Sequence, residues 1–252
     1  MLKLSNISKK FNNLHVLQSL SCTVNPGDFI IIMGPNGTGK TTLFDIISGK
    51  VAPDQGSICL DGIDISSMPE QKRAGFISRL FQNTYLGSCS ALTVRENLAM
   101  ATLKERSAGF QLATGAFPEK IVAEFLAPLN LEKLLDVPMS SLSGGQRQMI
   151  AFIMSILKPP KLLLLDEPTA ALDPTSATQL LSFAKKYAQM HKVPILLITH
   201  DPMIAKHLGD RLWILGNGAI QKVFGPEKSM MDPQDFFHPI HYEALLNIKE
   251  YQ

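Results

Sequence analysis

Residues 34–42 carry the pattern of a phosphate-binding loop, G-x-x-x-x-G-K-T, followed by a second threonine. Glycines in such a loop let backbone N–H groups wrap phosphate oxygens, and the start of the following helix adds the positive end of its dipole. We expect Lys40 to reach the β- and γ-phosphates of a nucleotide and the Thr41 hydroxyl to bind Mg²⁺. The predicted nucleotide-binding residues of this loop are Gly34, Pro35, Asn36, Gly37, Thr38, Gly39, Lys40, Thr41 and Thr42.

Two carboxylates, Asp166 and Glu167, follow a run of four leucines, and His200 follows a second apolar run at residues 195–199. The carboxyl ends of parallel strands meet at one edge of a sheet, where ligands bind. We therefore expect Gly34, Asp166 and His200 to converge there. Asp166 is predicted to hold Mg²⁺ through a water, Glu167 to act as general base on the attacking water, and His200 to contact the γ-phosphate.

A second candidate anion site lies at Ser143-Gly144-Gly145-Gln146. Serine followed three residues later by glutamine is a capping box, so the segment could simply start a helix over residues 144–157. Two glycines in a first helical turn are unfavourable, however, and are explained if a phosphate approaches the backbone closely. Since the first phosphate site is already complete, we expect this second site to serve the ATP of another subunit.

The elements that position these residues alternate between strands and helices. Continuous apolar runs predict buried strands at 29–33, 162–165 and 194–199, with helices at 40–48 and 174–190. Further strands are predicted at 2–7, 16–24, 57–60, 76–81, 211–215 and 219–224, the last two joined by an Asn-Gly turn.

Between residues 85 and 160 the spacing of apolar residues becomes helical. Helices are predicted from Thr93 to about 104, over 118–129 and over 144–157, and a loop is predicted at 107–117. The predicted fold is α/β: a P-loop NTPase core with a mainly parallel sheet, an antiparallel β subdomain and an inserted α-helical lobe. We assign one domain, 1–252. Its predicted parts are the core with the β subdomain (1–84 and 161–225), the helical lobe (85–160) and a C-terminal tail (226–252) with a helix near 241–250.

The composition narrows the class of protein. Hydrophobic residues make up 45% and charged residues 18% of the 252 residues, which is typical of a globular chain. A net charge of +2 gives no reason to expect a nucleic-acid partner. Three scattered cysteines suggest neither disulfides nor a zinc pair and fit a reducing cytosol. We see no signal peptide and no apolar run near the roughly 20 residues of a membrane helix, so any membrane role requires a partner.

With these motifs in this order, residues 1–225 resemble the ATP-binding subunit of an ABC transporter. The resemblance implies that Phe11 stacks on adenine, where the family more often has tyrosine, and that Val16 packs beside the base. It identifies Gln82 with the glutamine that touches Mg²⁺ and the attacking water, which makes Gln82 both a catalytic and a metal-binding candidate. His200 resembles the switch histidine of the family.

The resemblance also implies a head-to-tail homodimer with two ATP molecules at its interface. Ser143 and Gly145 of one subunit, with Gly144 and Gln146, would close the site of the other. Asp173 belongs to a segment resembling the loop that crosses the interface. Transmembrane permease subunits would dock a short cytoplasmic helix near residues 82–90, which places the chain peripherally at the cytoplasmic face of the cell membrane.

Residues 85–98 resemble those of bacterial importer ATPases that work with an amino-acid-type permease and an extracytoplasmic solute-binding protein. The ATPase of an exporter or lipid-handling complex is the first alternative. A non-transport ABC ATPase is the second, although such proteins usually carry two cassettes or long coiled-coil insertions. A kinase or GTPase would leave the Ser143 segment without a role. Neither the cargo nor the direction of transport follows from the sequence.

Overall fold

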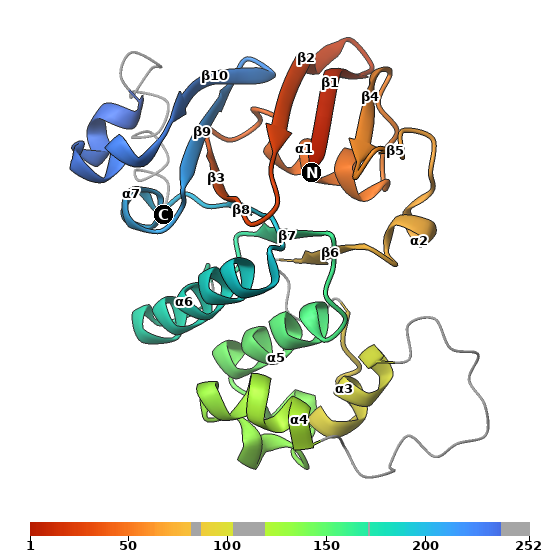
Figure 1. Cartoon of the computed structure of the whole chain (residues 1–252), viewed down its shortest axis with the longest axis vertical. Coiled ribbons are helices and arrows are strands. Elements are labelled where there is room, and N and C mark those ends of the chain that lie inside the picture. Colours follow the sequence, from red (N-terminus) through yellow and green to blue (C-terminus); the bar gives the residue numbers. More distant parts are fainter. Residues whose placement is uncertain (82–86, 103–118, 171, 238–252) are drawn as a thin grey trace.

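The computed structural model describes residues 1–81, 87–102, 119–170 and 172–237. Gln82, the predicted loop at 107–117, Ala171 and the predicted helix at 241–250 lie outside the described residues. The described residues form two β-sheets and a set of helices, with the helices α3, α4, α5 and α6 on one side of the larger sheet (Figure 1). This arrangement is the α/β P-loop fold expected from the sequence.

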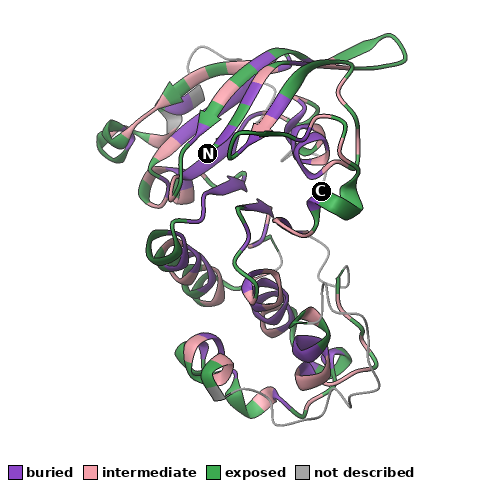
Figure 2. Ribbon diagram, turned by 45° about the vertical axis from the view of Figure 1, so that its right-hand side comes forward, coloured by how far each residue is buried: buried purple, intermediate pink, exposed green. Residues whose placement is uncertain are grey.

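The larger sheet has the strand order β10-β9-β3-β8-β7-β6. Its strands are β3 (Phe29–Met33), β6 (Ile77–Leu80), β7 (Leu162–Asp166), β8 (Ile195–Ile198), β9 (Arg211–Gly216) and β10 (Ala219–Phe224). All neighbours pair in parallel except the β9–β10 hairpin. Alternate residues face opposite sides: Ile30 and Ile32 belong to one apolar cluster, and Ile31 belongs to the other. Figure 2 shows the buried residues concentrated along these strands.

The smaller sheet is antiparallel, with the order β2-β1-β4-β5. Its strands are β1 (Leu2–Phe11), β2 (Leu14–Val24), β4 (Gln55–Leu60) and β5 (Ile63–Asp64). The first two are longer than predicted because register irregularities interrupt the apolar alternation while the pairing continues. Helix α1 (Lys40–Ser48) contributes buried side chains to the apolar cluster shared by the two sheets, and its bounds agree with the prediction.

The helical lobe contains α3 (Val94–Thr102) and α5 (Gly144–Ile156), both starting at predicted capping boxes. The segment predicted as a helix over 118–129 is helical over its described residues, 119–129, but it is not one regular α-helix. The chain there forms a short α-helix, α4 (Glu119–Ile121), a π turn, η1 (Val122–Leu126), and a 3₁₀ turn, η2 (Ala127–Leu129). Pro128 explains why the regular α-helix is interrupted, because it has no N–H to donate to the carbonyl oxygen one turn earlier.

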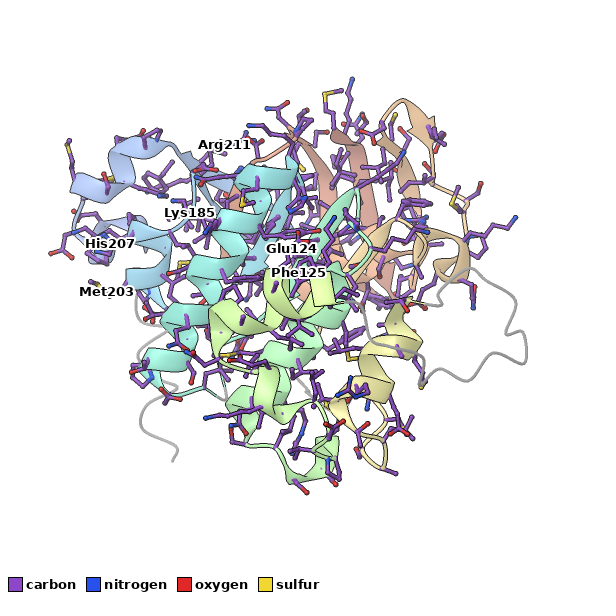
Figure 3. The ribbon with its side chains drawn as sticks, turned by 60° about the horizontal axis from the view of Figure 1, so that its bottom comes forward. Glu124, Phe125, Lys185, Met203, His207 and Arg211 are labelled. Carbon is purple, nitrogen blue, oxygen red and sulfur yellow. The ribbon has the colours of Figure 1, made fainter. Side chains whose placement is uncertain are left out.

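Helix α6 (Pro174–His191) packs against both the helical lobe and the larger sheet. The rings of Phe125 in η1 and Tyr187 in α6 lie 6.5 Å apart between centroids, and Figure 3 shows Glu124 and Phe125 on the side of the lobe that faces α6. The sequence did not predict several short elements, which are α2 (Glu70–Arg73), η3 (Glu132–Leu134), η4 (Met139–Ser141), α7 (Pro202–His207), η5 (Pro226–Met230) and η6 (Pro233–Phe237).

Candidate functional site

The phosphate-binding loop connects the end of β3 to the start of α1. Gly39 has φ 95°, and a Cβ there would lie 2.7 Å from the side chain of Leu17 and 2.8 Å from the carbonyl oxygen of Val16. A Cβ at Gly34 would lie 2.2 Å from the carbonyl oxygen of Leu215. Gly37 has φ 78°, and a Cβ there would meet nothing within 4 Å among the residues that the structure describes. Two of the glycines therefore allow close backbone packing, and the third leaves the open side of the loop free for a ligand.

The side chain of Lys40 lies inside this loop. Its Nζ donates hydrogen bonds to the carbonyl oxygens of Gly34 at 2.7 Å and Pro35 at 2.9 Å. Burial lowers the pKa of Lys40, while the carboxylates of Glu167 and Asp166 act to raise it. Helix α1 begins with no side-chain cap and no acidic residue in its first turn. Its first N–H groups therefore suit an anion, and a phosphate could replace the carbonyls as the partner of the ammonium group.

The ends of three neighbouring strands bring the other candidates to the same edge. Ile32 of β3 pairs with Ile198 of β8, which in turn pairs with Asp166 of β7. Immediately beyond these positions, Nε2 of His200 lies 2.9 Å from Oε1 of Glu167. Glu167 has a left-handed backbone, with φ 48°, an uncommon conformation for a residue with a side chain. The strained turn and the histidine together orient the carboxylate of Glu167.

Asp166 has a partner that the sequence analysis missed. Arg79 of β6 makes an ion pair with Asp166 at 2.6 Å and another with Asp45 of α1 at 2.5 Å. One signal for this network was available: Arg79 lies within a strand whose neighbours are buried, and a charge in that position normally needs a partner. The identity of the partners depends on how β6, β7 and α1 pack, which the sequence did not provide.

The residues present fit a magnesium ion. Mg²⁺ prefers oxygen ligands and is usually bound through one or two carboxylates together with substrate phosphates. Asp166 supplies a carboxylate at the sheet edge, and Thr41 supplies an exposed hydroxyl on the first turn of α1. Gln82, the third predicted metal ligand, lies outside the described residues.

The Ser143 segment starts α5 with both hydrogen bonds of a capping box. The backbone N–H of Gln146 donates to Oγ of Ser143 at 3.2 Å, and the N–H of Ser143 donates to Oε1 of Gln146 at 3.0 Å. Ser143 and Gly144 are exposed. Gly145 lies against α6, because a Cβ there would be 3.4 Å from Oγ of Ser176. The capping explanation is thus correct, and the exposed position also leaves the helix start accessible to a second molecule.

The remaining nucleotide candidates lie near the start of the chain and at the start of α6. Phe11 ends β1 opposite Leu14, is 45% exposed, and has Nζ of Lys9 at 5.3 Å from its ring centroid. Val16 borders the phosphate loop through its contact with Gly39. Asp173 caps α6 by accepting hydrogen bonds from the first-turn N–H groups. Its carboxylate is therefore already engaged within its own subunit, and hydrogen bonds from the Ser176 side chain and from the backbone N–H groups of Ser176 and Thr175 lower its pKa.

A cavity of about 580 Å³ lies between β6 and the helical lobe. Its lining includes Arg79 and Phe81 from the core and Asn97, Met100 and Met154 from the lobe. The cavity is also lined by Gly87, Ser88 and Cys89, which belong to the range 82–90 near which the sequence predicted that a permease helix would dock.

The fold and the site define a P-loop ATPase: a phosphate loop between β3 and α1, beside a carboxylate pair and a histidine at one sheet edge. The family model that matches residues 17–170, more than half of the chain, is described as ABC transporter. The chain belongs to the ABC transporter family, as an ATP-binding subunit that hydrolyses ATP to ADP and phosphate.

Two kinds of relatives support this assignment. The chain is 37% identical over 250 residues to the tyrosine transport ATP-binding protein of Clostridioides difficile (strain R20291), covering 96% of this chain and 99% of that protein. It is 33% identical to the spermidine/putrescine import ATP-binding protein PotA of Spiroplasma citri, covering 94% of this chain and 65% of that protein. The chain thus spans the whole of the first relative but less than two thirds of the second.

Solved structures agree with the family and the fold. The ADP conformation of MJ1267, an ATP-binding cassette of an ABC transporter, matches with a TM-score of 0.81 and 27% identity, covering 98% of both chains. The dimeric structure of MJ0796, a bacterial ABC transporter cassette, matches with a TM-score of 0.77 and 27% identity, covering 90% of this chain and 99% of that chain. Among the residues that the structure describes, no helix has the length and apolarity to cross a membrane.

Proposed function

We propose that this chain powers the import of a small solute such as an amino acid, working at the cytoplasmic face of the membrane with separate permease subunits. The full-length match to a tyrosine transport ATP-binding protein supports this, as do weaker matches to polyamine import proteins. An extracytoplasmic solute-binding protein would deliver the solute. The ATPase of an exporter or lipid-handling complex remains the main alternative, and a non-transport ABC ATPase is less favoured because the two relatives described above are transport proteins.

In this proposal the phosphate loop and Lys40 hold the β- and γ-phosphates of ATP, and Phe11 and Val16 hold the adenine. Thr41, Asp166 and Gln82 would hold Mg²⁺. When bound, the ion neutralises charge that develops on the phosphate oxygens. The observation that supports a hydrolytic site most directly is the contact at 2.9 Å between Glu167 and His200 at the edge next to the phosphate loop.

Glu167 positions the attacking water and accepts its proton as the oxygen approaches the γ-phosphorus. His200 holds the Glu167 carboxylate and can donate a hydrogen bond to a γ-phosphate oxygen from the same edge. Phosphoryl transfer depends mainly on such positioning and on electrostatic stabilisation. Both residues are only partly buried, with side-chain exposures of 26% and 41%, so a second subunit is needed to exclude water from the site.

The exposed start of α5 supplies the surface for that second subunit. Ser143 and Gly145 of one copy would approach the γ-phosphate held by the other, with Gly144 and Gln146 framing the helix start and Asp173 near the interface. ATP binding closes this homodimer, and hydrolysis reopens it. The cavity beside Arg79 would accept the permease helix, so that closure moves the permease.

An uptake experiment tests the direction and the cargo. Cells that lack the coding region are supplied with the chain or with its Lys40→Ala variant, and the import of labelled tyrosine and of labelled spermidine is measured. We expect the chain to restore uptake of one of them and the variant to restore neither. Normal uptake of both without the chain, with accumulation of another compound inside the cells, would favour the exporter.

A further inference from the structure

Arg79 connects three elements of the ATPase site. It lies on β6, and its two terminal nitrogens reach Asp45 on α1 and Asp166 at the end of β7, at 2.5 and 2.6 Å. Its side chain is 7% exposed, and those of the two aspartates are 16% and 13% exposed. A guanidinium group suits this arrangement because its planar fork can satisfy two carboxylates at once.

Two aromatic rings lie beside the guanidinium group. The central carbon of Arg79 lies 4.9 Å from the ring centroid of Phe81 and 5.8 Å from that of Phe44. The backbone carbonyl of Phe81 also accepts a hydrogen bond from Gln148 of α5 at 3.5 Å. Arg79 is therefore held by residues of the core, and its neighbour Phe81 is hydrogen-bonded to α5, the helix that Ser143 caps.

Stability alone does not explain this network. Buried ion pairs are often no more favourable than apolar residues of the same volume, because removing charges from water is costly. In addition, Nε of Arg79 is buried without a hydrogen-bond partner among the residues described, which is itself unfavourable. A positioning role would explain why the ion pair is present despite these costs, since the pair with Asp166 fixes the orientation of a carboxylate at the candidate site.

We propose that Arg79 is a positioning residue for the ATPase reaction: anchored by Asp45, it holds the Asp166 carboxylate in the orientation required to bind Mg²⁺ through water. A carboxylate has two oxygens with about four lone-pair sites, so the bond at Oδ2 leaves acceptor capacity for an ion-bound water. This inference rests on the proposed role of Asp166. Outer partners of metal ligands commonly change metal affinity by about 10- to 100-fold when removed.

The test follows a fluorescent ATP analogue bound to the purified chain while Mg²⁺ is titrated, with the analogue at a concentration that saturates each variant in EDTA. We expect Arg79→Met to raise the Mg²⁺ midpoint by roughly 10-fold or more. Asp45→Asn, which leaves the pair with Asp166 in place but removes its anchor, should shift the midpoint in the same direction by less.

Arg73 provides a matched control. Its guanidinium group is also buried, but it donates only to carbonyl oxygens, including those of Ile46 and Ile47 at the end of α1. Arg73→Met should lower the melting temperature and leave the Mg²⁺ midpoint unchanged. If the midpoint of Arg79→Met moves no more than that of Arg73→Met, Arg79 is only structural and the inference is wrong.

The opposite shift would also overturn the inference. If Arg79 were merely a counterion that offsets the negative charge of Asp45 and Asp166, removing it would lower the Mg²⁺ midpoint. If Arg79→Met does not fold, the Asp45→Asn result decides, since an unchanged or lowered midpoint contradicts the positioning role.

Asp166→Asn separates this inference from the proposed function. A normal Mg²⁺ midpoint in Asp166→Asn would refute the role of Asp166 itself. A shifted midpoint in Asp166→Asn together with a normal one in Arg79→Met would refute only the role of Arg79.

Discussion

Replacing Glu167 with glutamine tests the chemistry of the site with little change in its shape. The two side chains have the same length, and the unusual backbone with φ 48° is equally uncommon for both, so its strain is unchanged. The carboxylate is partly exposed and pairs with His200 at 2.9 Å, so we expect a change in folding stability below about 1 kcal/mol. An amide, however, cannot accept the proton of the attacking water at neutral pH.

The loss of a positioned general base usually lowers a rate by about 10²- to 10⁴-fold, which corresponds to about 2.7–5.4 kcal/mol of barrier. We therefore expect phosphate release by Glu167→Gln to fall at least about a hundredfold while nucleotide affinity is retained. Since ATP stays intact, gel filtration with Mg²⁺ and ATP should show a dimer.

Glu132→Gln, at an exposed position in the helical lobe, is the control for removing a glutamate charge. Turnover of Glu167→Gln within about tenfold of wild type, together with a monomeric elution profile, would show that another residue activates the water.

Three further predictions concern other parts of the chain. Phe11→Ala should weaken ATP binding by about 1–3 kcal/mol, the range for losing a base–aromatic stack, and an unchanged affinity in a titration would place another residue against adenine. Ser143→Ala removes a helix cap worth about 1 kcal/mol and should also abolish ATP-dependent dimers in gel filtration. Thr93→Ala, which removes the equivalent cap of α3, should affect stability alone, and equal dimer loss in both variants would contradict the proposed interface. Burial raises the pKa of Cys22 to about 12, so iodoacetamide at pH 8 should modify the exposed Cys89 far faster than Cys22; similar rates in a mass-spectrometric time course would show that the β2 strand opens readily.

Local patterns predicted the core of the site because each of its parts depends on short stretches of sequence. The glycine–lysine loop requires a strand before it and a helix after it, and the helix Lys40–Ser48 has the predicted bounds. Continuous apolar runs likewise marked β3, β7 and β8, whose parallel pairing then placed Glu167 and His200 at one edge. The fold class, and the meeting of the site residues at one edge of the sheet, could therefore be predicted from the sequence.

Features that depend on packing between distant segments could not be predicted from the sequence. Nothing near Arg79 in the sequence indicates that Asp45 and Asp166, 34 and 87 residues away, lie on either side of it. For residues 118–129 the sequence predicted a helix but not the kind of turn, since helical spacing persists through a π turn and a 3₁₀ turn although the hydrogen bonds change. The roles assigned to the individual site residues remain predictions.

One of the two apolar clusters runs without interruption from the sheet into the helical lobe. It includes Ile31 and Leu197 of the sheet, Ala184 of α6, Phe152 of α5 and Leu98 of α3. Such continuity means that, within the residues described, the lobe has no separate core whose melting could leave the sheet intact. On heating in a calorimeter, the insertion and the ATPase core should therefore lose their structure together, as one cooperative transition.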